Sequence, residues 1–236
     1  MENKITKLIA VAALMGSSFS VSALPTLQTY IDGSTYDAAT QTWVTNANSF
    51  TFSALGTNEG KGAGKGSIPL MDGTEVFISV AIDKNSLPTD GSITIDGTTI
   101  ASSSFIEGIP PIGLNPTPPN NDELASHGVF ETWFAEYSFT FDTSNGCLAC
   151  VSDMAPSGSG TDKDGWIENF VIDIAGFDSV HFDLYTKSVD ADGYTSIDHF
   201  APFSHDSEFS RVPTPGILYL FGIGLLGMYT ANRRKI

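Results

Sequence analysis

Positively charged residues are scarce in this chain. It contains 11 Lys and Arg residues against 27 Asp and Glu residues. Residues 24–210 hold five of the cations, all lysines, and 26 of the acids, which leaves this segment a net charge of −21 (5 − 26). Such a surface repels the phosphates of nucleic acids and of anionic lipids. We therefore expect no nucleic-acid partner, and an acidic surface that attracts cations and keeps the protein dispersed.

Catalytic signatures and amphipathic helices are missing as well. The chain has no G-x-S-x-G and no H-E-x-x-H motif, and almost no run has the i, i+3, i+4 spacing of apolar residues. An acid pair for glycoside hydrolysis can be drawn from Glu131 and Glu136, but their odd separation places them on opposite faces of a strand unless a bulge intervenes. We predict that the protein is not an enzyme.

The chain is instead rich in short runs in which apolar and polar residues alternate. This pattern predicts β-strands at residues 27–32, 49–55, 75–82, 92–101, 130–141, 166–174 and 180–186. Seven or more such strands, separated by Gly, Asn, Asp and Pro, predict an all-β domain. We expect an antiparallel β-sandwich of jelly-roll or immunoglobulin-like connectivity.

Two local features refine this prediction. The Asp96-Gly97 pair lies between two alternating runs and predicts a tight hairpin turn, because both residues tolerate positive φ. In the run at 130–141, Phe134 and Tyr137 have opposite parity, which predicts a β-bulge near Ala135 or Glu136. In the run at 180–186, Val180, Phe182 and Leu184 should face the core, with His181 on the outer face.

The N-terminus is typical of a secretory signal peptide. Lys4 and Lys7 precede an apolar stretch at residues 8–15, and small residues end the segment at Ala23. We place cleavage by signal peptidase after Ala23. The chain then divides into a signal peptide at 1–23, a β-sandwich ectodomain at 24–210 and a C-terminal tail at 211–236.

The tail combines three features in a fixed order. A Pro-x-Pro motif is followed by a fifteen-residue apolar run at 217–231 and then by a basic cluster, Arg233, Arg234 and Lys235. The run is shorter than the roughly 20 residues that usually span a bilayer, so a transmembrane helix here requires thinning or snorkelling. The basic cluster would hold its end in the cytoplasm. By these residues alone, the tail is a C-terminal membrane anchor.

The tail also resembles the PEP-CTERM sorting signals of Gram-negative bacteria. Val212, Pro213, Thr214 and Pro215 match the Val-Pro-x-Pro motif, with Thr214 in place of the usual Glu. The resemblance implies that an exosortase-type enzyme reads the tail, cuts near the motif and passes the protein to the cell surface or to the exopolysaccharide matrix of a biofilm. The anchored form in the inner membrane would then be an intermediate.

The ectodomain resembles the choice-of-anchor N proteins. The residues that carry this resemblance are at 24–44, 123–141, 180–186 and 197–206. The resemblance implies a β-rich domain at the cell surface and brings no established activity.

The only two cysteines, Cys147 and Cys150, lie in an exported segment. In an oxidising compartment they are expected to form a local disulfide, for which a turn at Asn145-Gly146 would be needed. Redox activity, free thiols and metal binding are the alternatives.

Two D-x-D-G segments suggest calcium loops. They comprise Asp162 with Asp164, and Asp190 with Asp192. The closing Glu of an EF-hand is replaced by Val171 and His199. Calcium therefore stays open only as a sandwich-loop site, and solvated Asp-Gly turns explain the same residues. No other cofactor is expected.

The histidines and tryptophans offer weaker candidates. His199 and His205 would form a transition-metal site if the chain folds back at Pro202. His127 and His181, like these two, have acids nearby in the sequence. Three tryptophans could stack on sugar rings or fill the core: Trp43, Trp133 and Trp166.

Taken together, these features predict an exported, non-enzymatic surface or matrix protein. The alternative is a carbohydrate- or calcium-binding module that acts in exopolysaccharide.

Overall fold

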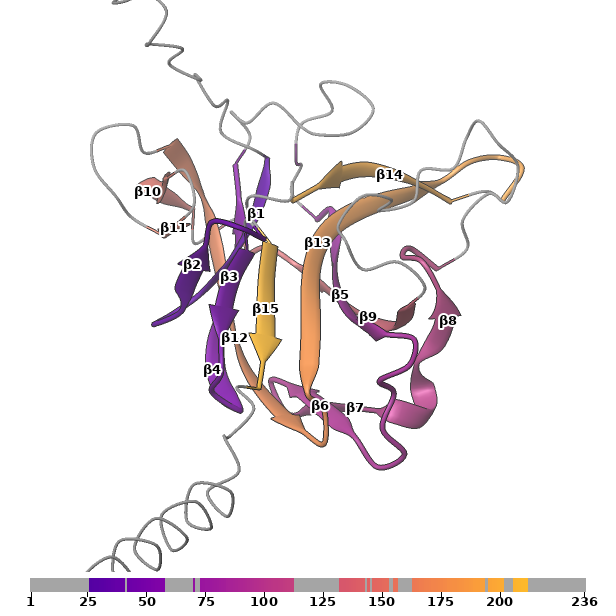
Figure 1. Ribbon diagram of the computed structural model, residues 1–236. Coiled ribbons are helices and arrows are strands. Elements are labelled where there is room, and N and C mark those ends of the chain that lie inside the picture. Colours follow the sequence, from indigo (N-terminus) through magenta and orange to yellow (C-terminus); the bar gives the residue numbers. More distant parts are fainter. Residues whose placement is uncertain are drawn as a thin grey trace, which may run out of the picture.

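The computed structural model describes residues 26–40, 42–57, 70, 73–112, 132–142, 144, 146–152, 155–156, 163–193, 195–201 and 206–211. Within these residues the regular elements are fifteen β-strands and one short 3-10 helix, η1 (Ser102–Ser104). The prediction of an all-β domain is confirmed. The strands form two sheets, an arrangement consistent with a β-sandwich (Figure 1).

The first sheet has β12 (Lys163–Ala175) at its centre. Its main path runs β1 (Leu27–Ile31), β4 (Ser49–Gly56), β12, β10 (Cys147–Ser152) and β11 (Ala155–Pro156). The hairpin of β6 (Ser92–Ile95) and β7 (Thr98–Ala101) joins the C-terminal part of β12. All of these pairings are antiparallel.

The second sheet runs β2 (Thr35–Asp37), β3 (Thr42–Thr45), β15 (Asp206–Ser210), β13 (Ser179–Val189), β5 (Glu75–Asp83), β9 (Thr132–Thr140) and β8 (Ile106–Gly108), with β14 (Thr195–Phe200) paired to β13. One pairing departs from the expected antiparallel pattern, because β15 runs parallel to β3. β15 lies between β3 and β13 and pairs antiparallel with β13.

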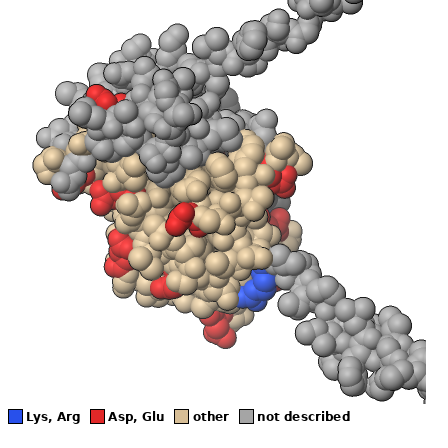
Figure 2. All heavy atoms as spheres, turned by 90° about the vertical axis from the view of Figure 1, so that its left-hand side faces the viewer, with Lys and Arg blue, Asp and Glu red and all other residues tan. Residues whose placement is uncertain are grey.

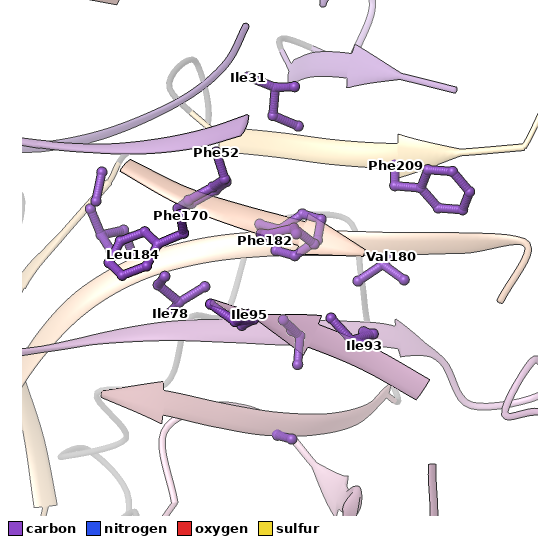
Figure 3. Packing of buried hydrophobic residues seen from close by; sticks show 14 of the residues in the cluster. Ile31, Phe52, Ile78, Ile93, Ile95, Phe170, Val180, Phe182, Leu184 and Phe209 are labelled. Carbon is purple, nitrogen blue, oxygen red and sulfur yellow. The ribbon is translucent and has the colours of Figure 1, made fainter. Parts of the chain in front are cut away.

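One hydrophobic core fills the space between the sheets. The second sheet contributes Val180, Phe182 and Leu184 of β13, which confirms their predicted orientation, and the first contributes Phe52 of β4 and Phe170 of β12. Figure 3 shows these rings and the neighbouring aliphatic side chains between the strands. Phe52 and Phe182 lie 5.5 Å apart between ring centroids, so that aromatic contacts join the two sheets directly.

The first and last strands of the domain are linked across this core. The hydroxyl groups of Thr29 on β1 and Ser207 on β15 lie 2.6 Å apart and share a buried hydrogen bond. Because the two strands belong to different sheets, this hydrogen bond joins the sheets through residues from the two ends of the described chain.

The Asp96-Gly97 hairpin is confirmed. Asp96 and Gly97 have φ values of 46° and 80°, and Ile95 pairs with Thr98 across the turn. Positive φ at both central residues is the requirement of a two-residue type I′ turn. The Asp96 carboxylate also accepts a hydrogen bond from the backbone N–H of Val171 at 2.7 Å, which ties the turn to β12.

The predicted bulge in β9 is wrong. β9 pairs with β5 without a break, from Thr140 opposite Glu75 to Thr132 opposite Asp83. The change of parity has another cause: Phe134 is buried on the outer face of the sheet, whereas Tyr137 packs against the core on the inner face. Both faces of this sheet are buried at this point, so no register shift is needed.

No helix among the described residues has the length and hydropathy to cross a membrane. The expected C-terminal helix, with the tail at 212–236, lies outside these residues, as does the expected signal peptide.

Candidate functional site

The outer face of the second sheet carries a row of ionisable side chains. Along β13, His181, Asp183, Tyr185 and Lys187 alternate with the core residues and therefore point away from the core. His181, Asp183 and Tyr185 are nonetheless 7%, 4% and 0% exposed. An outward position in the strand pattern is thus not a solvated one, and charges here carry a desolvation cost.

Three of the buried groups form what we call the His–Asp cluster: His181, Asp183 and Asp206. Asp206 comes from the neighbouring strand β15, where Ser207 pairs with Phe182, so the preceding residue faces Asp183. The His181 Nε2 atom lies 3.3 Å from an Asp183 carboxylate oxygen and 3.7 Å from an Asp206 carboxylate oxygen. One ligand atom from each of the three residues lies within 4.8 Å of the others.

The electrostatics of this cluster favour a positive charge at its centre. Burial by itself lowers the pKa of His181, but the carboxylates of Asp183 and Asp206 outweigh that effect and hold the pKa well above its ordinary value of 6.5. An imidazole nitrogen and two carboxylates are also ligands for divalent transition metals. The cluster can therefore hold a protonated imidazole or a metal ion.

The second group, which we call the Glu–Lys cluster, comprises Glu136, Tyr185 and Lys187. One Glu136 oxygen accepts hydrogen bonds from the Tyr185 hydroxyl at 2.6 Å and from the backbone N–H of Ile112 at 2.7 Å. The other accepts from the Lys187 ammonium at 2.5 Å. Burial, followed by the Glu136 carboxylate, raises the pKa of Tyr185 well above 10.0. Both oxygens of the Glu136 carboxylate therefore accept hydrogen bonds from neighbouring groups.

Among the described residues, the calcium candidates do not belong to the group of three potential ligands that the structure brings together. Asp190 and Asp192 are exposed, and the Asp190 carboxylate accepts from the backbone N–H of Asp192 at 2.9 Å, as in a local Asp-Gly turn. Asp164 is exposed at the start of β12, so this segment is a strand and not a loop. Asp162 lies outside the described residues.

The cysteine pair lies on β10. Cys147 and Cys150 belong to this strand, and its register to β12 shifts between Cys147 and Val151. Their side chains are outside the described part of the structure, so the disulfide stays a prediction.

The other histidines are only partly described. His199 is buried on β14, and its Nδ1 atom lies 2.8 Å from the Thr186 hydroxyl. His127 and His205 lie outside the described residues, as do Glu131 and the tail residues from Val212 to Lys235. The proposed pairing of His199 with His205 therefore stays untested.

All three tryptophans are half-buried and contact other side chains. Trp133 and Trp166 pack against the main core, and Trp133 donates its indole N–H to the Lys84 carbonyl at 3.1 Å. Trp43 makes edge-to-face contacts with Tyr30 and Tyr36, each at 5.1 Å between ring centroids.

The His–Asp cluster was not predicted as a site. The His181-x-Asp183 spacing on a strand places both side chains on one face, and that signal was available in the sequence. Asp206 carried no such signal, because its position depends on which strand lies beside β13.

Comparisons with protein-family models, with curated proteins and with solved structures gave no match to this chain.

Proposed function

We propose that the protein is an exported, non-enzymatic component of the cell surface or extracellular matrix, whose all-β domain is delivered through its C-terminal tail. The tail would be read by an exosortase-type enzyme after signal peptidase has removed residues 1–23. In this proposal the domain is a β-sandwich of jelly-roll or immunoglobulin-like type, and the apolar run at 217–231 is a temporary transmembrane helix.

The observation that carries the proposal is how the described elements fit between the two expected processing segments. β1 begins at Leu27, shortly after the expected cleavage at Ala23. β15 ends at Ser210, and the N–H of Arg211 donates to the Asp178 carbonyl at 2.8 Å. The sorting motif begins at the next residue, Val212. Cleavage near the motif would thus release the domain without removing any described strand.

The surface and the acid residues agree with this role. Figure 2 shows acidic side chains scattered over one face with little basic surface between them. An excess of one sign of charge keeps a domain soluble and dispersed. Glu136 belongs to the Glu131–Glu136 pair, the candidate acids for hydrolysis, and three donors hold its carboxylate. A carbohydrate- or calcium-binding role remains the alternative prediction, with no contact among the described residues that favours it.

The test is the intact mass of the protein recovered from the surface or medium of its own host, compared with a strain that lacks the sorting enzyme. We expect a chain that ends between Val212 and Gly216 in the first strain only. A variant with Arg233, Arg234 and Lys235 replaced by Gln should lose this processing, whereas Thr214→Glu, which restores the usual motif residue, should keep it. A chain that retains Ile236 in both strains would establish a permanent anchor and refute the proposal.

A further inference from the structure

We infer that the His–Asp cluster binds one divalent transition-metal ion, with zinc as the best candidate, and that this ion joins the last strand of the domain to β13. The inference rests on the geometry of His181, Asp183 and Asp206 and does not depend on the sorting tail. Because β15 is the strand that precedes the tail, the ion would hold the end of the domain in place.

The distances in the cluster fit a shared ion. Zinc lies about 2.0–2.2 Å from nitrogen and oxygen ligands, and tetrahedral geometry then separates two ligands by about 3.4 Å. The His181 Nε2 atom is 3.3 Å from Asp183 and 3.7 Å from Asp206. A direct bond between an imidazolium and a carboxylate is shorter, at about 2.7–2.9 Å. The two distances from His181 thus fit ligands of a common centre, and all three ligand atoms lie within 4.8 Å of one another.

The charges in the cluster also fit a divalent ion. Two carboxylates and one imidazolium leave a net charge of −1 in a region where Asp183 and Asp206 are 4% and 1% exposed. A divalent ion with two carboxylates and a neutral imidazole has no net charge, and His181 would release its proton on binding. Neutralising a buried site in this way removes much of the cost of burying its charges.

Ser79 provides an independent observation. This residue of β5 pairs with Asp183 and therefore points to the same outer face. It is fully buried, and within the described part of the chain its hydroxyl has no hydrogen-bond partner. Buried hydroxyl groups without partners are uncommon. A water molecule in the fourth coordination position of the ion would supply the missing partner.

The ligand set selects the type of ion. Calcium takes six to eight oxygen ligands, and magnesium keeps several waters in an octahedral shell. A buried set of one imidazole nitrogen and two carboxylates matches neither. Zinc also accepts three protein ligands with a water molecule in the fourth position, an arrangement known mainly from catalytic zinc sites, and imidazole nitrogen suits zinc, copper, iron and nickel.

The experiment uses the untagged full chain, purified in detergent, stripped with a chelator and refolded with zinc, with manganese or with calcium. After dialysis we expect about one zinc ion per chain by mass spectrometry of the metals. Asp206→Asn and His181→Gln should lower this content at least about tenfold. The matched control is Asp178→Asn, which removes the same charge from a side chain that is 87% exposed, and it should keep the zinc.

Cobalt substitution separates the cluster from other ligands, including the cysteine pair, and does not require stable variants. Cobalt bound in the wild-type chain should give the visible bands of four coordination by nitrogen and oxygen. Thiolate charge-transfer bands would place the ion at Cys147 and Cys150 and overturn the inference. Three other results would also overturn it: folded wild-type protein that binds neither zinc nor cobalt, folded Asp206→Asn or His181→Gln that keeps the zinc, and binding of calcium alone.

Discussion

The His–Asp and Glu–Lys clusters both include side chains from the outer face of β13, and both contain buried carboxylates whose charge needs a partner. The two clusters provide that partner differently. In the Glu–Lys cluster, a lysine and two neutral donors hold one carboxylate at 2.5–2.7 Å. In the His–Asp cluster, two carboxylates share one imidazole at 3.3 and 3.7 Å. The difference reflects the supply of cations in a chain with 27 acids and 11 Lys and Arg residues. In the Glu–Lys cluster a lysine pairs tightly with the carboxylate, whereas in the His–Asp cluster the described partner of the two carboxylates is an imidazole, and such a site suits a cation from outside.

The largest effect should come from breaking the Glu–Lys cluster. The side chains of Lys187 and Glu136 are 15% and 8% exposed, so Lys187→Met would leave a buried carboxylate without its cation. We expect urea denaturation to show a loss of roughly 3–5 kcal/mol in the free energy of unfolding. Adding Glu136→Gln, which keeps an acceptor for Tyr185, should restore most of that loss. If the double variant is no more stable than Lys187→Met, the charge of Glu136 is not the cause.

A smaller loss should follow Asp206→Asn in the metal-free protein. The substitution keeps the volume of the side chain and leaves one carboxylate with one imidazolium, which is a balanced pair. We expect a loss of about 1–2 kcal/mol by urea denaturation with a chelator present, as for a buried hydrogen bond that is weakened. A loss greater than that of Lys187→Met would reverse the proposed order of the two clusters.

The third expected effect is on the pH dependence of stability, to which His181 of the His–Asp cluster should contribute. The pKa of His181 is raised in the folded state, so the folded protein binds more protons than the unfolded one above pH 6.5. The stabilisation is therefore complete below about pH 6.5 and is lost as the pH rises through the folded pKa, by up to about 1.4 kcal/mol per pH unit. Chelator-treated wild type should show this decline, and His181→Gln should not. Burial also raises the pKa of Glu208 above 4.5, so the contribution of Glu208 to stability is likewise lost as the pH rises, starting near pH 4.5. Glu208→Gln is therefore a second control, in which the decline above pH 6.5 should persist.

The smallest effect on stability should come from Ser79→Ala. Removing a buried hydroxyl that has no partner should change the free energy of unfolding of the metal-free protein by less than about 0.5 kcal/mol. Zinc affinity, in contrast, should fall roughly tenfold or more, because groups that hydrogen-bond to bound ligands contribute to affinity. Zinc titration of both proteins measures the second effect, and equal affinities would remove Ser79 from the site.

Local sequence patterns predicted the structure correctly where alternation marks the core face of a strand or where a turn depends on its own two residues. The alternation at 180–186 placed Val180 and Phe182 in the core, and Asp96-Gly97 forms the expected turn. The bulge in β9 failed because Phe134 is buried on the outer face, a condition that alternation cannot reveal. The strands β2, β3, β8, β10, β11, β14 and β15 were not predicted; β2, β3, β8 and β11 are short, and β15 (DSEFS) is polar apart from Phe209.

The sequence by itself determined that the domain is built of strands, because side chains alternate between the two faces of any strand and the chain repeats that period. It also determined which side of β13 carries His181, Asp183, Tyr185 and Lys187. Only the tertiary structure decided that this side is buried, that Asp206 meets His181 and that Lys187 meets Glu136. These contacts join strands far apart in the chain, and they depend on the insertion of β15 beside β13 and on the order of β13, β5 and β9 in the sheet. Periodicity fixes the face of a residue, whereas its neighbours across the sheet follow from how the strands pair.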